Sequence, residues 1–345
     1  MKQLLALFLM LLILPTSLYS CGGAKNDNAN NSDNSLEITS DKPDTSDVPT
    51  VNEVSLEISE NEKNSYKTVV LGDSIARGYG LESPESMRFS ALLELSLKSV
   101  YEEVSVSNYG VDGRTGAELV EFLKTTPPEE IKDCDSVIIS IGGNNILQML
   151  DSIETAMNAL KELDPKAVAD YFKYTVTPDG EEKDKLSYAC DVLSKAFGAI
   201  NVAFESDTFN SLITDAGKRL EEEIPQLIDE IRKINPNATV YFQTVYNPYK
   251  DVNISFQDVE QKLDLAAHGE RAVAYLNAPI EALAEECGYE LVPVWSEFDK
   301  SNKKLTNAGI SLLTANISFD PHPNANGHEL IGELYFDIIS EEKNG

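Results

Sequence analysis

Three side chains in two widely separated segments have the chemistry of a nucleophile, a base and an acid. Ser74 follows the apolar run 68–71 and a Gly-Asp pair, so its hydroxyl would stand on a tight turn at the carboxyl end of a strand. His322 lies in a His-Pro-Asn loop, where an imidazole can take the serine proton and return it to a leaving group. Asp320 precedes this histidine by two residues and is placed to fix its tautomer. These three residues are candidates for a catalytic triad.

Two further segments end in glycines and could stabilise a developing negative charge. The strand-like run 106–108 leads to Gly110 and Gly113, and either glycine would let a backbone N–H approach a ligand closely. The run 137–141 leads to two glycines and then Asn144, whose amide offers a neutral N–H donor. Each segment alone is also consistent with an ordinary turn or a helix cap. Their occurrence together favours an oxyanion-binding site.

These segments, in this order, resemble the SGNH (GDSL-type) serine hydrolases. The resemblance implies ester hydrolysis with Ser74 as nucleophile and His322 as base, and with no metal or organic cofactor. It assigns the oxyanion hole to Asn144 and to the backbone N–H groups of Ser74 and Gly113, with Gly110 as the alternative glycine.

The chain departs from the family pattern at two positions. The family commonly has an aspartate where this chain has Asn145. It also commonly places the triad acid three residues before the histidine, a position that Phe319 occupies here. Asp320 is therefore the nearest acid. The alternative is a Ser–His dyad whose imidazole is oriented by a backbone carbonyl.

The two other histidines are expected to be packed or surface residues. His268 lies inside a long helical stretch, and His328 follows a glycine at the start of the last one. His322 and His328 with Asp320 could suggest a metal site, but the chain has no second histidine cluster to complete it.

Alternating apolar and amphipathic runs predict a three-layer α/β/α sandwich around a parallel sheet of about five strands, which is the flavodoxin-like fold of the SGNH family. We expect one hydrolase domain over residues 66–342 and find no internal repeat. Residues 146–217 exceed an ordinary crossover and predict an insertion that walls the substrate cleft or only pads the surface. The expected strands are 68–71, 103–108, 136–141, 238–245 and 290–294, and the expected helices are 89–100, 116–124, 220–234, 259–287 and 327–339.

The amino terminus has the pattern of an export signal. The apolar run 4–14 is too short to span a bilayer, which takes about 20 residues, but suits the core of a signal peptide over residues 1–20. Leu18 to Cys21 resembles a lipobox, so we expect Cys21 to carry a lipid that anchors the protein to the outer face of a bacterial membrane. Cleavage by an ordinary signal peptidase is the alternative.

Composition limits the partners of the exported chain. Residues 21–65 are polar and acidic and predict a disordered tether. The chain has 28 Lys and Arg against 58 Asp and Glu, a net charge of −30, which argues against a nucleic-acid partner. Cys134, Cys190 and Cys287 have neither disulfide-framework nor zinc-motif spacing.

The expected substrate is a small-molecule or carbohydrate ester, with O-acetyl groups on a polysaccharide as one class. Lysophospholipids and acyl thioesters also lie within the family's range. From another functional class, a protein of the same fold that only binds surface glycans or lipids is the alternative.

Overall fold

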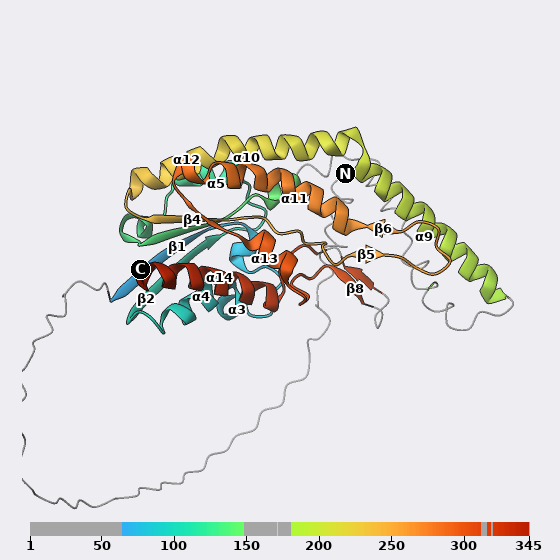
Figure 1. The fold of residues 1–345 in the computed structure, drawn as a ribbon, viewed down its shortest axis with the longest axis horizontal. Helices are drawn as coiled ribbons and strands as arrows, with labels where there is room; N and C mark the ends of the chain where they lie inside the picture. Colours follow the sequence, from blue (N-terminus) through green and yellow to red (C-terminus); the bar gives the residue numbers. More distant parts are fainter. Residues whose placement is uncertain (1–63, 148–170, 172–180, 312–315, 319, 345) are drawn as a thin grey trace, which may run out of the picture. The chain divides into compact units, whose positions relative to one another are not determined.

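The computed structural model describes residues 64–147, 171, 181–311, 316–318 and 320–344 (Figure 1). All of these residues belong to one compact unit. The predicted signal peptide, Cys21, nearly all of the tether and Phe319 lie outside the described residues, as does most of the first part of the predicted insertion.

A five-stranded parallel sheet forms the centre of this unit. The strand order is β2-β1-β3-β4-β7, and every neighbouring pair is parallel. This arrangement confirms the α/β fold with a central parallel sheet that the sequence predicted. The strands are β1 (Ser65–Gly72), β2 (Glu103–Gly110), β3 (Ser136–Ser140), β4 (Thr239–Gln243) and β7 (Glu290–Val292).

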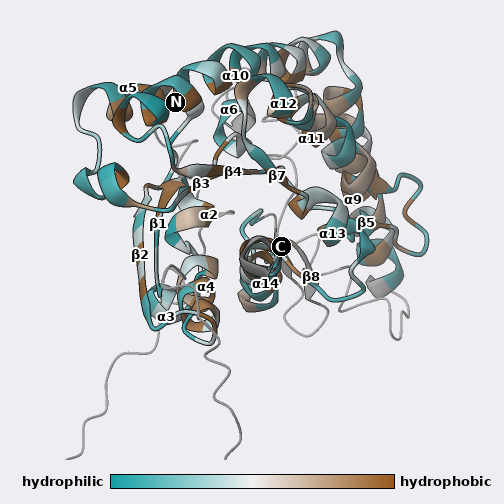
Figure 2. Cartoon of the chain, turned by 60° about the vertical axis from the view of Figure 1, so that its left-hand side comes forward, coloured by the Kyte–Doolittle hydropathy of each residue, from teal (hydrophilic) through white to brown (hydrophobic). Residues whose placement is uncertain are grey.

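Helices cover both faces of the sheet because the central strands are apolar on both sides. Val69 and Leu71 of β1 belong to one core cluster, with α5 (Gly116–Thr125), α10 (Asp207–Ile234) and α11 (Leu265–Ala282). Val70 belongs to the opposite cluster, with α4 (Phe89–Leu97), α13 (Val294–Lys300) and α14 (Ala325–Asn344). Figure 2 shows the strands between these two helical layers.

Short helices complete the sheet connections. These are α2 (Ser74–Arg77), α3 (Pro84–Met87), α6 (Gly143–Leu147), α12 (Ala284–Cys287) and the 3-10 turn η1 (Glu129–Asp133).

Two expected helices have different bounds in the structure. The helix expected over 259–287 is wrong in its first part, because residues 263–264 form β6 (Leu263–Asp264) and the Asp264 side chain then caps α11 by accepting the Ala267 N–H. The helix expected over 220–234 is the second half of α10, which begins at Asp207 after the Ser206 cap. The expected end of the insertion at residue 217 therefore lies inside α10.

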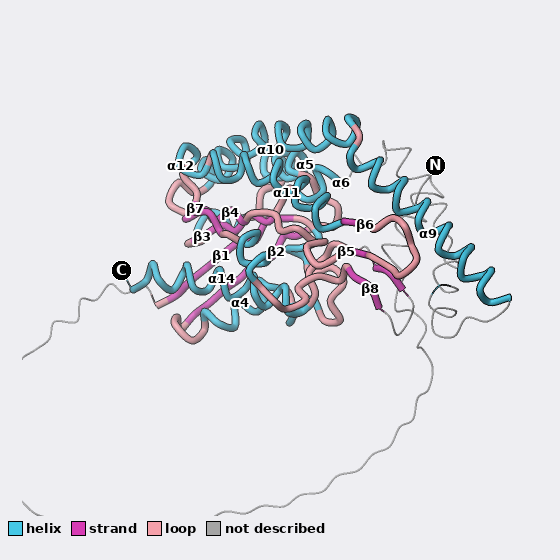
Figure 3. The backbone as a smooth tube through the Cα atoms, turned by 45° about the vertical axis from the view of Figure 1, so that its right-hand side comes forward, coloured by secondary structure: helices cyan, strands magenta, loops and turns pink. Residues whose placement is uncertain are grey.

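The described part of the insertion contributes the long helix α9 (Glu181–Glu205). This helix packs on the antiparallel pair formed by β5 (Asn253–Ile254) and β6 (Figure 3). These elements share a third core cluster, which also includes Ala308. A second antiparallel pair, β8 (Gly309–Ser311) with β9 (Asn316–Ser318), follows directly. Among the described helices, none is long and apolar enough to cross a membrane.

Close approach between backbone segments explains two glycines at the carboxyl end of the sheet. A Cβ atom on Gly72 would lie 2.3 Å from the Ser140 carbonyl oxygen, and one on Gly110 would lie 2.4 Å from the Arg77 amide nitrogen. In the register of the sheet, Gly72 pairs with both Gly110 and Ser140. The loops that follow β1, β2 and β3 therefore leave the sheet at the same level, at the edge where open α/β sheets bind ligands.

Candidate active site

The turn after β1 holds Ser74 at this edge of the sheet. Asp73 caps the one-turn helix α2, because its Oδ1 accepts the Ile75 N–H at 2.9 Å. Gly78 ends α2 with a φ of 85°, a left-handed conformation that glycine adopts without strain. Ser74, between these two caps, is largely buried.

The loop before α14 brings His322 to Ser74 across 248 positions of sequence. The Nε2 atom of His322 lies 3.0 Å from Ser74 Oγ, and the Nδ1 atom lies 2.6 Å from Asp320 Oδ1. The same Asp320 oxygen accepts the backbone N–H of His322 at 3.0 Å, which closes the turn between the two residues. With Nδ1–H donated to the carboxylate, Nε2 is the acceptor that faces the serine hydroxyl.

Two aromatic side chains and one backbone N–H contact the loop that carries His322. The Tyr79 ring lies 4.5 Å from the His322 ring, centroid to centroid. The hydroxyl of the buried Tyr246 donates to the Pro321 carbonyl oxygen at 2.9 Å. Burial raises the pKa of Tyr246 well above its ordinary value, so the phenol remains a neutral donor. The backbone N–H of Asn307 also donates to the His322 carbonyl oxygen at 2.9 Å.

The side-chain amide of Asn144 lies next to the nucleophile turn. Its Nδ2 donates to Asp73 Oδ2 at 3.3 Å and to the Arg114 carbonyl oxygen at 3.1 Å. Burial raises the pKa of Asp73 to about 7, although the hydrogen bond from the Ile75 N–H favours its charged form. The amide of Asn144 is thus fixed between the loops that follow β1 and β2.

The two candidate glycines after β2 have different surroundings. The Gly110 N–H donates to Asn108 Oδ1 at 2.9 Å, and the Cα of Gly110 packs against α2. Gly113 has a φ of 76°, and no heavy atom lies within 4 Å of the position that a Cβ would take. Of the two glycines, Gly113 is thus the one with open space at the position of a Cβ.

His268 and His328 are both buried, and their hydrogen-bond partners are not the triad candidates. The His268 ring stacks on Phe204, and its Nε2 lies 3.2 Å from Asn201 Oδ1. The Nδ1 of His328 accepts the Phe89 N–H at 3.2 Å. Within the described ranges, no three His, Cys, Asp or Glu residues are arranged to hold a metal ion.

Sequence reasoning did not identify the contact of Tyr79 with His322, the hydrogen bond of Tyr246 to Pro321 or the burial of Glu223. Glu223 had a usable signal, because it lies on the same helical stripe as Leu220, Ile224 and Leu227, where an apolar residue is expected. Tyr79 and Tyr246 follow β1 and β4 at the carboxyl edge, but nothing in their local sequence indicates which loop they contact.

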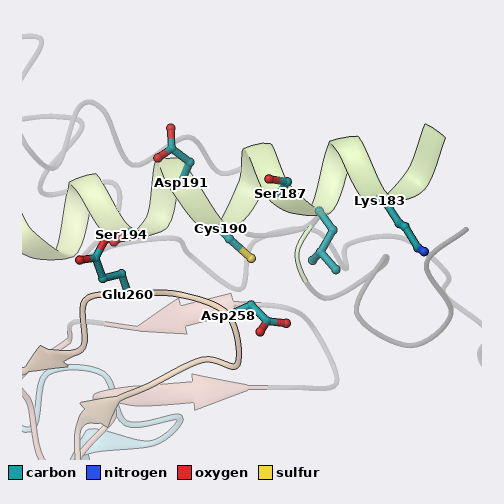
Figure 4. A pocket seen from close by; sticks show the side chains of 8 residues that line it. Lys183, Ser187, Cys190, Asp191, Ser194, Asp258 and Glu260 are labelled. Carbon is teal, nitrogen blue, oxygen red and sulfur yellow. The ribbon is translucent and has the colours of Figure 1, made fainter. Parts of the chain in front are cut away.

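A separate hollow of about 380 Å³ lies between α9 and the segment 258–260 (Figure 4). Its lining includes the side chains of Lys183, Asp191, Asp258 and Cys190, and none of the triad candidates. Burial, with a smaller effect of Asp258, raises the pKa of the Cys190 thiol, which disfavours the reactive thiolate. Cys134, Cys190 and Cys287 are free thiols.

The chain is similar to known proteins in sequence and in structure. The protein YpmR of Bacillus subtilis (strain 168), which is uncharacterized, is 22% identical over 283 residues, covering 81% of this chain and 84% of YpmR. The lipase Lip_vut3 from a goat rumen metagenome is 16% identical, with a TM-score of 0.48 over 78% of this chain and 95% of the lipase.

A variant of an acetyl xylan esterase from Geobacillus stearothermophilus is also 16% identical, with a TM-score of 0.46 over 79% of this chain and 94% of the esterase. The family model for the GDSL-like Lipase/Acylhydrolase family matches residues 70–330, a range that contains every candidate site residue named above. The chain therefore belongs to the GDSL-like lipase/acylhydrolase family and is a hydrolase that acts on ester bonds.

Proposed function

We propose that this hydrolase cleaves carboxylic esters through an acyl-enzyme formed on Ser74. The observation that carries the proposal is the continuous chain of contacts from Ser74 Oγ to His322 Nε2 at 3.0 Å and from Nδ1 to Asp320 Oδ1 at 2.6 Å. A nucleophile, a base and an orienting carboxylate within hydrogen-bond reach of one another are the requirements for this chemistry.

The reaction has two halves. Ser74 Oγ attacks the ester carbonyl carbon while its proton passes to His322 Nε2, and the carbonyl electron pair moves onto the oxygen. Collapse of this tetrahedral intermediate expels the alcohol, which takes the proton from Nε2. A water molecule then repeats the attack on the acyl-enzyme, with His322 again as base, and releases the carboxylic acid and free Ser74.

Three N–H donors are proposed to bind the oxyanion of both intermediates: the Asn144 side-chain amide and the backbone N–H groups of Gly113 and Ser74. The support for Asn144 is its fixed position beside the nucleophile turn, where one N–H would exchange its 3.3 Å hydrogen bond to Asp73 for one to the oxyanion. The support for Gly113 is the open space at the position that a Cβ would take, which contrasts with the packed Gly110. Neutral donors held in place before the reaction stabilise charge as it develops.

We further propose export of the protein and a lipid on Cys21, which would place the site at the outer face of a bacterial membrane. O-acetyl groups on polysaccharides are a substrate class that suits an exported, tethered esterase. Lysophospholipids and acyl thioesters are the alternative substrates. A series of p-nitrophenyl esters with acyl chains of increasing length separates these classes, because acetyl specificity requires kcat/KM to fall sharply beyond the shortest chains.

The test of the mechanism compares wild type with Ser74→Ala and His322→Ala on p-nitrophenyl acetate. Each variant should lower kcat by about 10⁴-fold, because triad members act as a unit. Ser211→Ala is a matched control, since Ser211 is an exposed serine on α10. Covalent labelling by a fluorophosphonate, followed by peptide mass analysis, should locate the modification on Ser74. Esterase activity that survives in folded Ser74→Ala would refute the mechanism and favour the non-catalytic glycan- or lipid-binding alternative.

A further inference from the structure

Glu223 is a buried carboxylate that the triad does not use. It lies on the inner face of α10, where its helical neighbours Leu220, Ile224 and Leu227 are fully buried apolar side chains. The helix α10 contacts both α5 and α6, as the three ribbons show in Figure 2. A carboxylate in such a position needs specific polar partners, because burial without them is costly.

The partners of Glu223 are the start of α5 and the side chain of Asn145. Glu223 Oε2 accepts the Asn145 Nδ2–H at 2.9 Å. A Cβ atom on Gly116 would lie 2.0 Å from the same oxygen, so glycine at this position gives the carboxylate its space. The backbone N–H of Ala117 also favours the charged form of Glu223, at the helix end where backbone donors favour an anion.

Burial raises the pKa of Glu223, while the hydrogen bonds from Asn145 and Ala117 and the nearby Arg219 act in the opposite direction. A carboxylate accepts from both of these donors with its lone pairs and leaves no proton of its own without an acceptor.

Asn145 joins Glu223 to the loops that carry the proposed oxyanion donors. Its Oδ1 accepts the Gly116 N–H at 3.2 Å, and its Nδ2 is held by Glu223. Its neighbour Asn144 reaches the same pair of loops, because the Asn144 amide donates to the Arg114 carbonyl oxygen at 3.1 Å. Two side-chain hydrogen bonds, made by Asn144 and Asn145, thus connect the segment 142–145 to the segment 113–116. Glu223 fixes the orientation of the Asn145 amide.

We propose that Glu223 is a positioning residue that acts through Asn145 to hold Asn144 and Gly113 at the spacing the oxyanion requires. This inference rests on the proposed hydrolytic function. It also accounts for the asparagine at position 145. An aspartate there would turn a second carboxylate toward Glu223, whereas the amide accepts from Gly116 with its oxygen and donates to Glu223 with its nitrogen.

The test exchanges the acid and the amide between the two positions. Glu223→Gln places an amide N–H2 group among hydrogen-bond donors, and Asn145→Asp places two carboxylates next to each other. Each variant should lower kcat by about tenfold or more and change KM by less than about twofold. The double variant Asn145→Asp/Glu223→Gln restores one donor and one acceptor between the two side chains. It should recover kcat to within about threefold of wild type, a coupling that independent sites do not show.

Glu222→Gln is the matched control, because Glu222 is the exposed neighbour on the same helix and carries the same charge. Thermal unfolding of each variant separates loss of fold from loss of positioning. If Glu223→Gln does not fold, Asn145→Asp and the double variant provide the same comparison. Wild-type kcat in folded Glu223→Gln, or a double variant no better than the single ones, overturns the inference.

The rate of fluorophosphonate labelling on Ser74 distinguishes this failure from failure of the proposed function. If wild type neither labels on Ser74 nor hydrolyses p-nitrophenyl acetate, the hydrolytic mechanism is wrong and the positioning role falls with it. If wild type labels on Ser74 and the Glu223 and Asn145 variants label at the same rate, the mechanism stands and only the positioning role is wrong.

Discussion

At the scale of single residues, the spacing of Asp320 and His322 departs from the family pattern, yet the carboxylate reaches the ring. Asp320 Oδ1 lies 2.6 Å from Nδ1 and 3.0 Å from the backbone nitrogen of His322. We expect Asp320→Asn to lower kcat by about 10²- to 10⁴-fold without unfolding the protein, because an amide can hold the wrong tautomer of the imidazole. Steady-state kinetics on p-nitrophenyl acetate, with circular dichroism of the same samples, measure both effects.

Asp320→Ala is the companion variant for this prediction. If a backbone carbonyl oriented His322 without help from the carboxylate, both substitutions would cost less than about tenfold in kcat, or 1.4 kcal/mol in barrier. Rates close to wild type in both variants would therefore exclude Asp320 as the triad acid and leave a Ser–His dyad.

At the scale of secondary-structure elements, the contact between α14 and α4 depends on a neutral histidine. The first residue of α4 has no side-chain cap from Arg88, and its N–H instead donates to Nδ1 of His328, which is fully buried on α14. Burial lowers the pKa of His328 to about 4, with a smaller effect from His322. A protonated ring could not accept this hydrogen bond.

This contact predicts an acid-sensitive contribution to stability. In the unfolded chain His328 binds a proton below about pH 6.5, whereas in the folded chain it binds one only below about pH 4. The free energy of unfolding therefore falls as pH decreases between these values. Across this pH range the free energy of unfolding should decrease by on the order of 3 kcal/mol. His328→Asn should be less stable than wild type at pH 7.5 but should lose less stability between pH 7.5 and 5. Urea unfolding at both pH values measures this, and equal losses in the two proteins would contradict it.

At the scale of the whole molecule, the acidic chain is proposed to be held at a membrane by its amino terminus. The sequence carries a net charge of −30, which favours neither nucleic acid nor an anionic lipid surface, so membrane association would depend on the anchor. We expect wild type expressed in a bacterial host to partition with membranes. Cys21→Ser should remain unprocessed by the lipoprotein route, because the thiol is the lipid acceptor.

Mass spectrometry of the mature first residue tests the anchor directly. Ser20→Ala is the control, because it keeps a small residue before the cysteine. Wild-type protein found only in the soluble fraction, with no lipid mass on Cys21, would show that an ordinary signal peptidase processes the chain.

Local residue order was enough to predict the strand cores and to select Ser74, His322 and Asn144 as candidates. Buried parallel strands are short apolar runs, and catalytic groups sit in turns whose residue types are set locally. Boundaries that depend on caps were less predictable. The start of α11 at Leu265 follows from the Asp264 cap and from the pairing of β5 with β6, a contact made only in the folded chain.

Contacts between distant segments cannot be read from local residue order. The choice between Gly110 and Gly113 depended on the packing of α2 against β2, and the reach of Asp320 depended on how its loop turns back to His322. The pairing of Glu223 with Asn145 joins residues 78 positions apart. The sequence does not identify the hydrogen-bond partner of an amide or a carboxylate. Folding removes water from both groups and leaves one geometry that satisfies them, and for that reason these pairings appear only in the tertiary structure.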